Sequence, residues 1–395
     1  MSVENLIYGD VPAFENADDI LREKVFECGK RIYGKAFENE CVQERCLKEL
    51  ELVSQYRIGN LLLHTYDIVK EADCAGYLTS FRGNLGNLYV AFLLGLTDVN
   101  PLPVHYYCRY CGKVEFSDDG TGIFAERKTA ECPDCGKEFT PDGYNLSYIF
   151  FADPQKATPS NICIDVPCEL LKKTGCVRLD KSSDYKGKLQ ISPCEQLDML
   201  CMLEKATGVS PDAIPLNDTE VFMQFSEGRA EGFSDGVPLE VMRRINPQNM
   251  SELVNAIGIL HGINIWKGNQ LMLTDMRHRL ETMGTLKEDV YQNLISCKIP
   301  REKAFEITEE IRRGYLIRNS TSLPEMMNYL RTEGVSESYV DYLSRIRYLY
   351  PKGAAIRTAR LYYQFAWFKL RYPEEYMRSK ENTLDSLVVW KQNSQ

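Results

Sequence analysis

Four cysteines in two close pairs are the residues whose spacing most clearly suggests chemistry. The pairs are Cys108-Arg-Tyr-Cys111 and Cys132-Pro-Asp-Cys135; they are separated by twenty residues, and each is followed by Gly-Lys. Two C-x2-C pairs at this distance can place four thiolates around one tetrahedral Zn2+ and leave no position for water. The spacing predicts a structural zinc ribbon at about residues 104–140 that fastens a hairpin and performs no reaction.

A short glycine loop upstream of the cysteines is a candidate phosphate site. It reads Arg82-Gly83-Asn84-Leu85-Gly86 and lies between an expected strand at 77–81 and an expected helix at about 85–96. Glycines let backbone N–H groups approach an anion, a helix N-terminus adds partial positive charge, and arginine adds a forked donor. The same short pattern is typical of an ordinary glycine turn before a core helix, so both interpretations stay open.

A basic and aromatic segment at 339–380 is a candidate nucleic-acid contact. It has nine basic and three acidic residues, in a chain whose formal net charge is −9. Phosphate contact and base stacking need this mixture, although a solvated face on an aromatic-cored helix has it too. The basic residues are Arg345, Arg347, Lys352, Arg357, Arg360, Lys369, Arg371, Arg378 and Lys380.

Length and composition limit the class of protein. The chain has 395 residues, of which 44% are hydrophobic, so it can form two or three domains with real cores. It contains no apolar run of membrane-spanning length, and its acidic beginning, MSVENLIYGD, lacks a signal pattern. We therefore expect a cytoplasmic protein whose fourteen cysteines are reduced, with no membrane partner.

The surrounding elements divide the chain into three predicted parts: 1–56, a helical lead-in; 57–194, a part with strands; and 195–395, an almost wholly helical part. We expect strands at 61–63, 77–81, 148–151 and 162–164. We expect helices at 16–34, 40–56, 66–72, 85–96, 195–206, 322–332 and 352–371.

Several segments together resemble the palm and fingers of PolC-type bacterial DNA polymerase III alpha subunits. IVKEADCAGYLTSFRGNLGN resembles the palm strand with its SRGS-type triphosphate loop, and TDVNPLPVHYYCRYC resembles the approach to that family's zinc ribbon. GILHGINIWKGN, with His261, Trp266 and Asn269, and YLYPKGAAIRTARLYYQFAWFKLRYPEEY resemble two fingers motifs. A buried His-Trp pair closing a helical turn would also account for His261 and Trp266.

The resemblance implies an α+β fold: a nucleotidyltransferase-like palm with an inserted zinc ribbon, followed by an all-α fingers-like domain. It implies templated DNA synthesis with Mg2+ as cofactor, a reaction in which carboxylates gather two ions. Phosphate or nucleotide contacts would fall to Arg82, Gly83, Asn84, Gly86 and Lys352. Nucleic-acid contacts would fall to Arg345, Arg347, Arg357 and Arg360.

The catalytic carboxylates of that family are missing. No Asp-x-Asp occurs in the chain, Asp165 is the only weak candidate for a metal ligand, and Gln190 stands where the family has its third aspartate. A neutral amide lacks the charge that holds a divalent ion. The family's loop serine is Asn84 here, its fingers tyrosine is Thr358, and the thumb has no counterpart.

Three hypotheses follow. The first is a thumbless, catalytically inactive relative that binds DNA, a nucleotide or a replication protein. The second is an active DNA polymerase or nucleotidyltransferase in which Asp165 acts with Asp153, Asp180, Asp184 or Glu195. The third is a protein-interaction module that imitates part of a polymerase.

Overall fold

The computed structural model describes residues 14–117, 124, 127–153, 159–170, 189–270, 283–314 and 322–393, with side chains up to 383. The protein divides into two compact units, one formed by 1–215 with 367–395 and the other by 216–366. These units differ from the division at 56/57 and 194/195 inferred from the sequence. That division stays a prediction, because family domains need not coincide with compact units.

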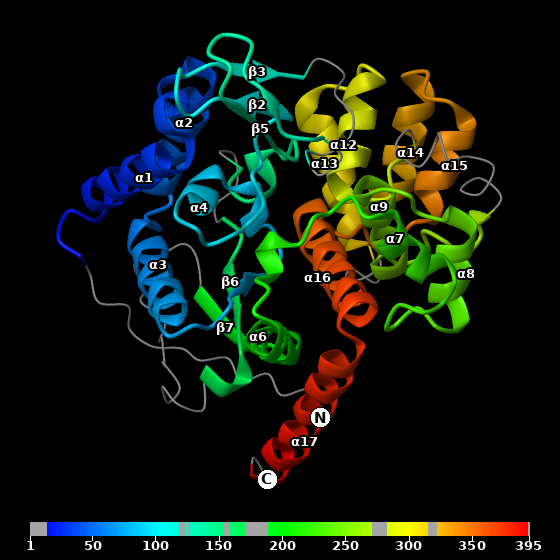
Figure 1. Cartoon of the computed structure of the whole chain (residues 1–395). Helices are drawn as coiled ribbons and strands as arrows, with labels where there is room; N and C mark the ends of the chain where they lie inside the picture. Colours follow the sequence, from blue (N-terminus) through cyan, green and yellow to red (C-terminus); the bar gives the residue numbers. More distant parts are fainter. Residues whose placement is uncertain are drawn as a thin grey trace. The chain divides into compact units, whose positions relative to one another are not determined.

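The first unit begins with three packed helices (Figure 1). They are α1 (Ala17–Tyr33), α2 (Glu40–Gln55) and α3 (Gly59–Cys74), with the short 3-10 helix η1 (Gly34–Glu38) after α1. The helices expected at 16–34 and 40–56 are confirmed. The strand expected at 61–63 is wrong, because those three leucines lie inside α3. All three are buried since α3 packs against both α1 and β6, and a helix covered on several sides has no polar stripe.

A three-stranded sheet lies at the centre of this unit. β1 (Ser80–Phe81) runs antiparallel to β6 (Ile162–Val166), which runs parallel to β7 (Leu189–Pro193), in the order β1-β6-β7. The strand expected at 162–164 is confirmed, whereas that at 77–81 shrinks to its last two residues. The segment expected as a strand at 148–151 is a 3-10 helix, η4 (Tyr148–Phe150). The helix expected at 85–96 is η2 (Leu85–Asn87) followed by α4 (Tyr89–Leu93).

A second sheet is inserted between β1 and β6 along the chain. Its order is β3-β2-β5-β4, all antiparallel, and it carries the four paired cysteines in its turns. The strands are β2 (His105–Tyr107), β3 (Val114–Phe116), β4 (Ala130–Glu131) and β5 (Glu138–Asp142). The inserted ribbon that the sequence predicts is therefore present as a hairpin sheet.

Two further helices complete the first unit. α6 (Glu195–Thr207) follows β7 directly and ends at Gly208, whose φ of +71° suits glycine. α17 (Pro373–Asn393) comes from far along the chain and packs on α6, where the Thr383 hydroxyl lies 3.8 Å from the Met202 sulfur. The short η5 (Pro211–Ala213) follows α6.

The second unit is helical throughout its described part, which confirms the helical texture expected after Glu195. α16 contributes buried side chains to its core, including Ile356 and Tyr363, because apolar residues occupy several of its faces. Within the described residues, no helix combines the length and the hydropathy needed to cross a membrane. The helices are α7 (Thr219–Ser226), α8 (Gly236–Ile245), α9 (Met250–His261), α12 (Lys287–Ser296), α13 (Arg301–Arg313), α14 (Ser322–Thr332), α15 (Glu337–Arg345) and α16 (Lys352–Arg371).

The junction between α1 and the inserted sheet generates a prediction about Gly34. Its φ is +58°, and a Cβ there would lie 2.4 Å from the Arg109 carbonyl oxygen, which accepts the Lys35 N–H at 3.0 Å. Gly34→Ala should lower the free energy of unfolding by about 2 kcal/mol or more in urea titration. Gly76→Ala is the control, because Gly76 also has positive φ but no atom within 4 Å of the added Cβ. Equal losses in the two variants would contradict the close approach.

Candidate phosphate-binding loop and metal centre

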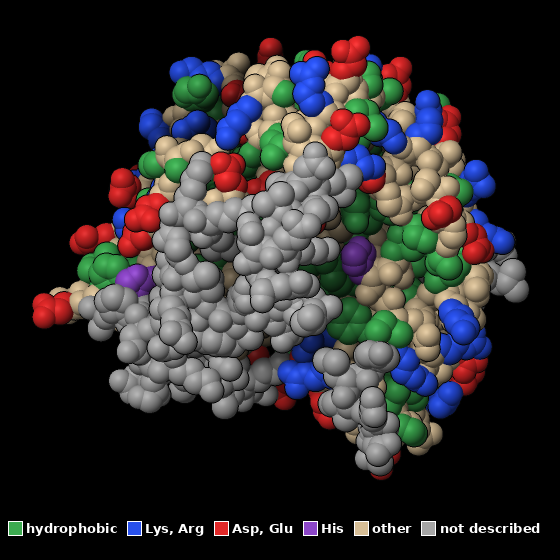
Figure 2. Space-filling model, turned by 90° about the horizontal axis from the view of Figure 1, so that it is seen from below, with side chains coloured by type: hydrophobic (Ala, Val, Ile, Leu, Met, Phe, Trp, Pro, Cys, Tyr) green, Lys and Arg blue, Asp and Glu red, His purple; other side chains and the backbone are tan. Residues whose placement is uncertain are grey.

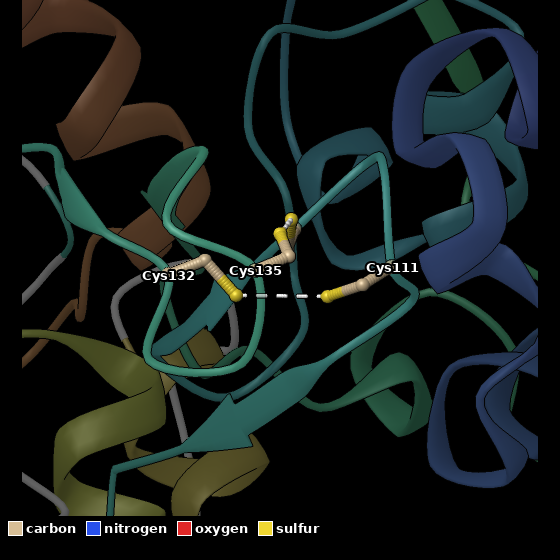
Figure 3. Close-up of side chains that lie close together, drawn as sticks. Cys111, Cys132 and Cys135 are labelled. Carbon is tan, nitrogen blue, oxygen red and sulfur yellow. Dashed lines mark hydrogen bonds between the residues drawn. The ribbon is translucent and has the colours of Figure 1, made fainter.

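The four sulfurs of the inserted sheet are arranged like ligands of one ion. Cys108 Sγ lies 3.5 Å from Cys135 Sγ, Cys111 Sγ lies 3.6 Å from Cys132 Sγ, and all four lie within 4.8 Å of one another. Figure 3 shows Cys111, Cys132 and Cys135 converging from two turns. A tetrahedral ion with metal–sulfur bonds of about 2.3 Å needs sulfurs about 3.8 Å apart. The four cysteines therefore fit a closed tetrahedral metal site.

The two cysteine turns share one backbone pattern, which explains the repeated Gly-Lys. Cys108 N–H donates to the Lys113 carbonyl, and Cys132 N–H donates to the Lys137 carbonyl, at 2.8 and 2.6 Å. Gly112 and Gly136 have φ values of +91° and +68°, which glycine adopts most readily. Burial opposes ionisation of the Cys108 thiol, yet backbone N–H groups of Cys111 and Tyr110 lower its pKa to about 6. Such donors stabilise a thiolate ligand.

A buried polar network lies under this ribbon, and sequence reasoning did not find it. The Asn100 amide donates to the Tyr33 hydroxyl and to the Asp142 carboxylate, both at 2.6 Å. The Tyr33 hydroxyl also lies 3.3 Å from His105 Nε2. Burial lowers the pKa of His105 and raises that of Tyr33, so both stay neutral near pH 7. The network joins α1 to the inserted sheet and has a structural role.

The loop arginine pairs with the one acidic residue of β6. Arg82 N–H donates to the Cys163 carbonyl at 2.9 Å, which continues the β1–β6 ladder into the loop. Arg82 Nε lies 2.5 Å from Asp165 Oδ1; the Asp165 carboxylate is buried, whereas the Arg82 side chain is 49% exposed. The sequence singled out both residues, and the structure brings them together.

Two other loop residues are held by the protein: Asn84 by hydrogen bonds and Gly86 by burial. The Asn84 side-chain amide donates to the Phe150 carbonyl at 3.0 Å and to Ser160 Oγ at 2.9 Å, so it anchors the loop. Gly86 is buried, whereas Gly83 is exposed with φ +69° and has no atom within 4 Å of a Cβ built on it. Gly83 is thus the exposed glycine of the loop.

The helix N-terminus after the loop already holds an anion from the protein. Val90 N–H, at the start of α4, donates to Glu49 Oε2 at 2.9 Å, and Arg45 Nε lies 2.5 Å from Glu49 Oε1. Burial raises the pKa of Glu49, although Arg45 and the backbone donors act against this rise. Arg45 also donates to the carbonyls of Asn87 and Leu146. The i,i+4 spacing of Arg45 and Glu49 was the only sequence signal for this arrangement.

The polar face of the three-stranded sheet carries a single carboxylate. On β6 and β7 the buried Ile162, Ile164, Leu189 and Ile191 alternate with Cys163, Asp165, Gln190 and Ser192, and Cys163 pairs in register with Gln190. Gln190 Nε2 donates to Ser192 Oγ at 3.3 Å, and Cys163 Sγ lies 3.9 Å from Gln190 Oε1. Burial, reinforced by Asp165, raises the pKa of the Cys163 thiol. Asp165 is thus the one carboxylate among these alternating positions of β6 and β7.

Other carboxylates do not complete a metal site within the described residues. Among those residues, three or more His, Cys, Asp or Glu side chains lie close enough to share an ion only at the four ribbon cysteines. Glu195 is exposed at the start of α6, and Asp153 accepts the Tyr56 hydroxyl through its backbone carbonyl. Asp180 and Asp184 lie outside the described residues.

In the second unit, the predicted phosphate ligand Lys352 also contacts carboxylates. Its Nζ lies 2.8 Å from Asp289 Oδ1, and its backbone N–H donates to Glu288 Oε2 at 2.7 Å, at the start of α16. The two motifs that resemble fingers segments meet where Ile263 and Tyr348 form an isolated antiparallel bridge. Arg345, just before the second motif, donates to the Gly268 carbonyl at 2.7 Å and lies 3.3 Å from Asn269 Oδ1. Arg347 donates to the carbonyls of Ser344 and Ile346.

Several aromatic residues of the basic segment belong to the core. Tyr363 and Phe368 are fully buried, and the Tyr363 ring lies 5.0 Å from the ring of Phe222. His261 stacks on Tyr350 at 4.8 Å, and Trp266 is 7% exposed. Arg357 and Arg360 are half-buried on α16. Figure 2 shows basic and acidic side chains interspersed on the described part of one face of the molecule. Packing therefore accounts for the buried aromatic residues, whereas Tyr362, Trp367 and Tyr372 are half-buried.

Comparison with known families identifies the two halves of the chain. Residues 19–173 match the family model described as bacterial DNA polymerase III alpha NTPase domain. Residues 196–327 match the one described as bacterial DNA polymerase III alpha subunit finger domain. The chain therefore belongs to the bacterial DNA polymerase III alpha-subunit family, and the resemblance stated from the sequence is confirmed.

The similar curated proteins are of the PolC type. DNA polymerase III PolC-type of Thermotoga maritima is 24% identical over 96% of this chain, and that of Bacillus subtilis is 23% identical over 95%. The chain spans about a third of the length of these relatives, 36% and 34% respectively. The Thermotoga alignment extends over 498 residues, more than the 395 of this chain, so the relative has segments inside the matched region that this chain lacks.

The cysteine geometry predicts a tightly held metal ion. Elemental analysis should find about one ion per chain, and Cys108→Ser with Cys132→Ser should lose it. The same double variant should lose more than about 3 kcal/mol of stability, since metal binding contributes directly to folding. Cys41→Ser, which changes an exposed cysteine of α2, should keep both. A double variant with full metal content would refute the site.

Proposed function

We propose that this protein is a catalytically inactive member of its family that binds phosphate groups of DNA or a nucleotide through the loop at Arg82. The observation that carries the proposal is the polar face of the described strands β6 and β7, where Asp165 is the only carboxylate and contacts Arg82. A two-metal reaction needs several carboxylates around the ions. Cys163, Gln190 and Ser192 occupy the neighbouring positions and supply no comparable charge.

The proposed inactive protein would keep the domains of its active relatives as a scaffold. In this proposal 57–194 is a degenerate nucleotidyltransferase-like palm, and 195–395 is a fingers-like domain. The missing internal segments relative to the Thermotoga protein support the absence of a thumb. The four cysteines would hold a structural Zn2+, which four thiolates in a closed tetrahedron favour over harder ions. In this proposal Mg2+ would be a cofactor only if the protein were active.

Binding is assigned to few groups. The exposed guanidinium of Arg82 and the open backbone at Gly83 are the accessible donors of the loop, whereas Asn84 and Gly86 shape it. Lys352, Arg345 and Arg347 contact protein acceptors, so they contribute less to a ligand than the sequence suggested. Arg357 and Arg360 remain candidate contacts to nucleic acid.

A protein-interaction module is the second candidate. It is favoured because Lys352 contacts Asp289 and Arg345 contacts the Gly268 carbonyl, so both cations already have partners within the protein. A replication protein would then be the partner, and the chain would occupy the place of a polymerase part without contacting DNA. An active nucleotidyltransferase with a rearranged metal site is the third candidate. It requires carboxylates outside the described residues, such as Asp180 and Asp184, to reach Asp165. A cytoplasmic location accompanies all three candidates.

The inactive form predicts the result of a primer-extension assay. Purified protein with Mg2+, primed template and all four deoxynucleoside triphosphates should extend no more primer than a reaction without protein, because one carboxylate cannot hold two ions. Asp165→Asn should behave identically. Extension by the unaltered protein that Asp165→Asn abolishes would overturn the proposal and favour the rearranged site.

Binding assays separate the first two candidates. Labelled single-stranded DNA and a labelled nucleotide are titrated with protein at two salt concentrations. Loss of one charge-assisted contact in Arg82→Gln should weaken binding about tenfold, and DNA binding should weaken steeply with salt. Arg243→Gln, which removes an exposed arginine of α8 outside the basic segment at 339–380, is the matched control. Absence of binding to either ligand at low salt would favour the interaction module.

A further inference from the structure

We propose that Asp165 is an internal anion that occupies Arg82, so that a ligand phosphate binds by exchanging places with the Asp165 carboxylate. The inference rests on the proposed function of the loop and adds its regulation. Its basis is the close pair formed by Arg82 Nε and Asp165 Oδ1. A carboxylate and a phosphate oxygen compete for the same guanidinium edge.

The two partners differ in their freedom to move. Asp165 lies on β6, the central strand of the sheet, and is 1% exposed, so its position is fixed by strands on both sides. Arg82 follows the last residue of β1 and is 49% exposed, with the open conformation of Gly83 next to it. The exchange must therefore occur by movement of the arginine while the carboxylate stays in place.

The pair explains why a phosphate would bind weakly to the unaltered protein. Moving Arg82 to a ligand removes a cation from a buried carboxylate, which is strongly unfavourable. The ligand gains one charge-assisted contact and the protein loses another. Anion affinity should thus be lower than an Arg82 without a carboxylate partner would give.

Carboxylates of the protein also contact backbone N–H groups and a lysine at other places. Glu49 accepts the Val90 N–H at the start of α4, and Asp198 accepts the N–H groups of Cys168 and Glu169 at 2.9 and 3.1 Å. In the other unit, Glu288 and Asp289 contact the backbone and side chain of Lys352. Of the two cations paired in this way, the Arg82 side chain is about half exposed, whereas that of Lys352 is 20% exposed. Exchange is therefore expected at Arg82.

The test uses two probes that represent the two sources of phosphate. Inorganic tripolyphosphate stands for a free nucleotide-like anion, and a fluorescein-labelled single-stranded DNA stands for a phosphodiester backbone. Asp165→Asn keeps the side-chain shape and removes the competing charge, so it should raise affinity for at least one probe about tenfold or more. The double variant with Arg82→Gln should lose this gain. The probe that responds identifies the source.

Asp67→Asn is the matched control, because Asp67 is exposed on α3 and its removal changes the net charge equally. It should alter affinity less than about twofold, since exposed distant charges are screened. Unchanged or weaker binding by a folded Asp165→Asn protein, with binding still dependent on Arg82, would overturn the exchange and leave the proposed function standing. Binding of both probes that ignores Arg82→Gln would overturn the proposed function as well.

A measurement on the unaltered protein keeps the proposal testable if Asp165→Asn does not fold. The Arg82 side-chain Nε–Hε signal is assigned in an NMR spectrum by its absence in Arg82→Gln. Saturating tripolyphosphate should shift this signal, because the guanidinium changes partner. A signal that stays in place while the probe binds would overturn the exchange.

Discussion

The first unit depends on one buried ion pair. Glu49 is fully buried on α2, and its carboxylate receives Arg45 from its own helix and the Val90 N–H from α4. Arg45 then reaches the carbonyls of Asn87 and Leu146, on either side of the inserted sheet along the chain. Removal of one partner would leave a buried charge without compensation, which is costly. The glycine loop has its shape because this pair fixes where the loop ends.

The pair also bears on whether the glycine loop can bind an anion. A strand, a glycine turn and a helix N-terminus form a general anion site, and these parts are all present at 80–93. Here Glu49 fills the helix end and Asp165 contacts the arginine. The Arg82 guanidinium and the Val90 N–H are thus already matched by carboxylates of the protein itself. Such a site has little net attraction for anions unless one internal contact opens, which distinguishes it from a preformed phosphate cradle.

The sequence predicted features that depend on local spacing. The cysteine pairs specify their own geometry through adjacent glycines, and the 3.6-residue pattern of α1, α2 and α6 marks one buried face. The strand predicted at Leu61–Leu63 was wrong, because a helix covered on several sides can have the same short apolar run as a buried strand. The partners of Arg82 and Val90 could not be predicted, since 83 and 41 residues separate each pair and no local rule joins them. The family resemblance pointed to the loop at Arg82, but it did not predict that Asp165 and Glu49 contact the loop and the helix after it.

The division into units has a consequence for biosynthesis. Residues 216–366 form a complete unit, whereas the first unit needs both 1–215 and the residues from Trp367 onward. On the ribosome, the helical insertion can therefore finish folding while α6 still waits for α17, the helix that covers it. The N-terminal part of this chain would be the last to close, and until then an apolar helix face would be open to chaperones.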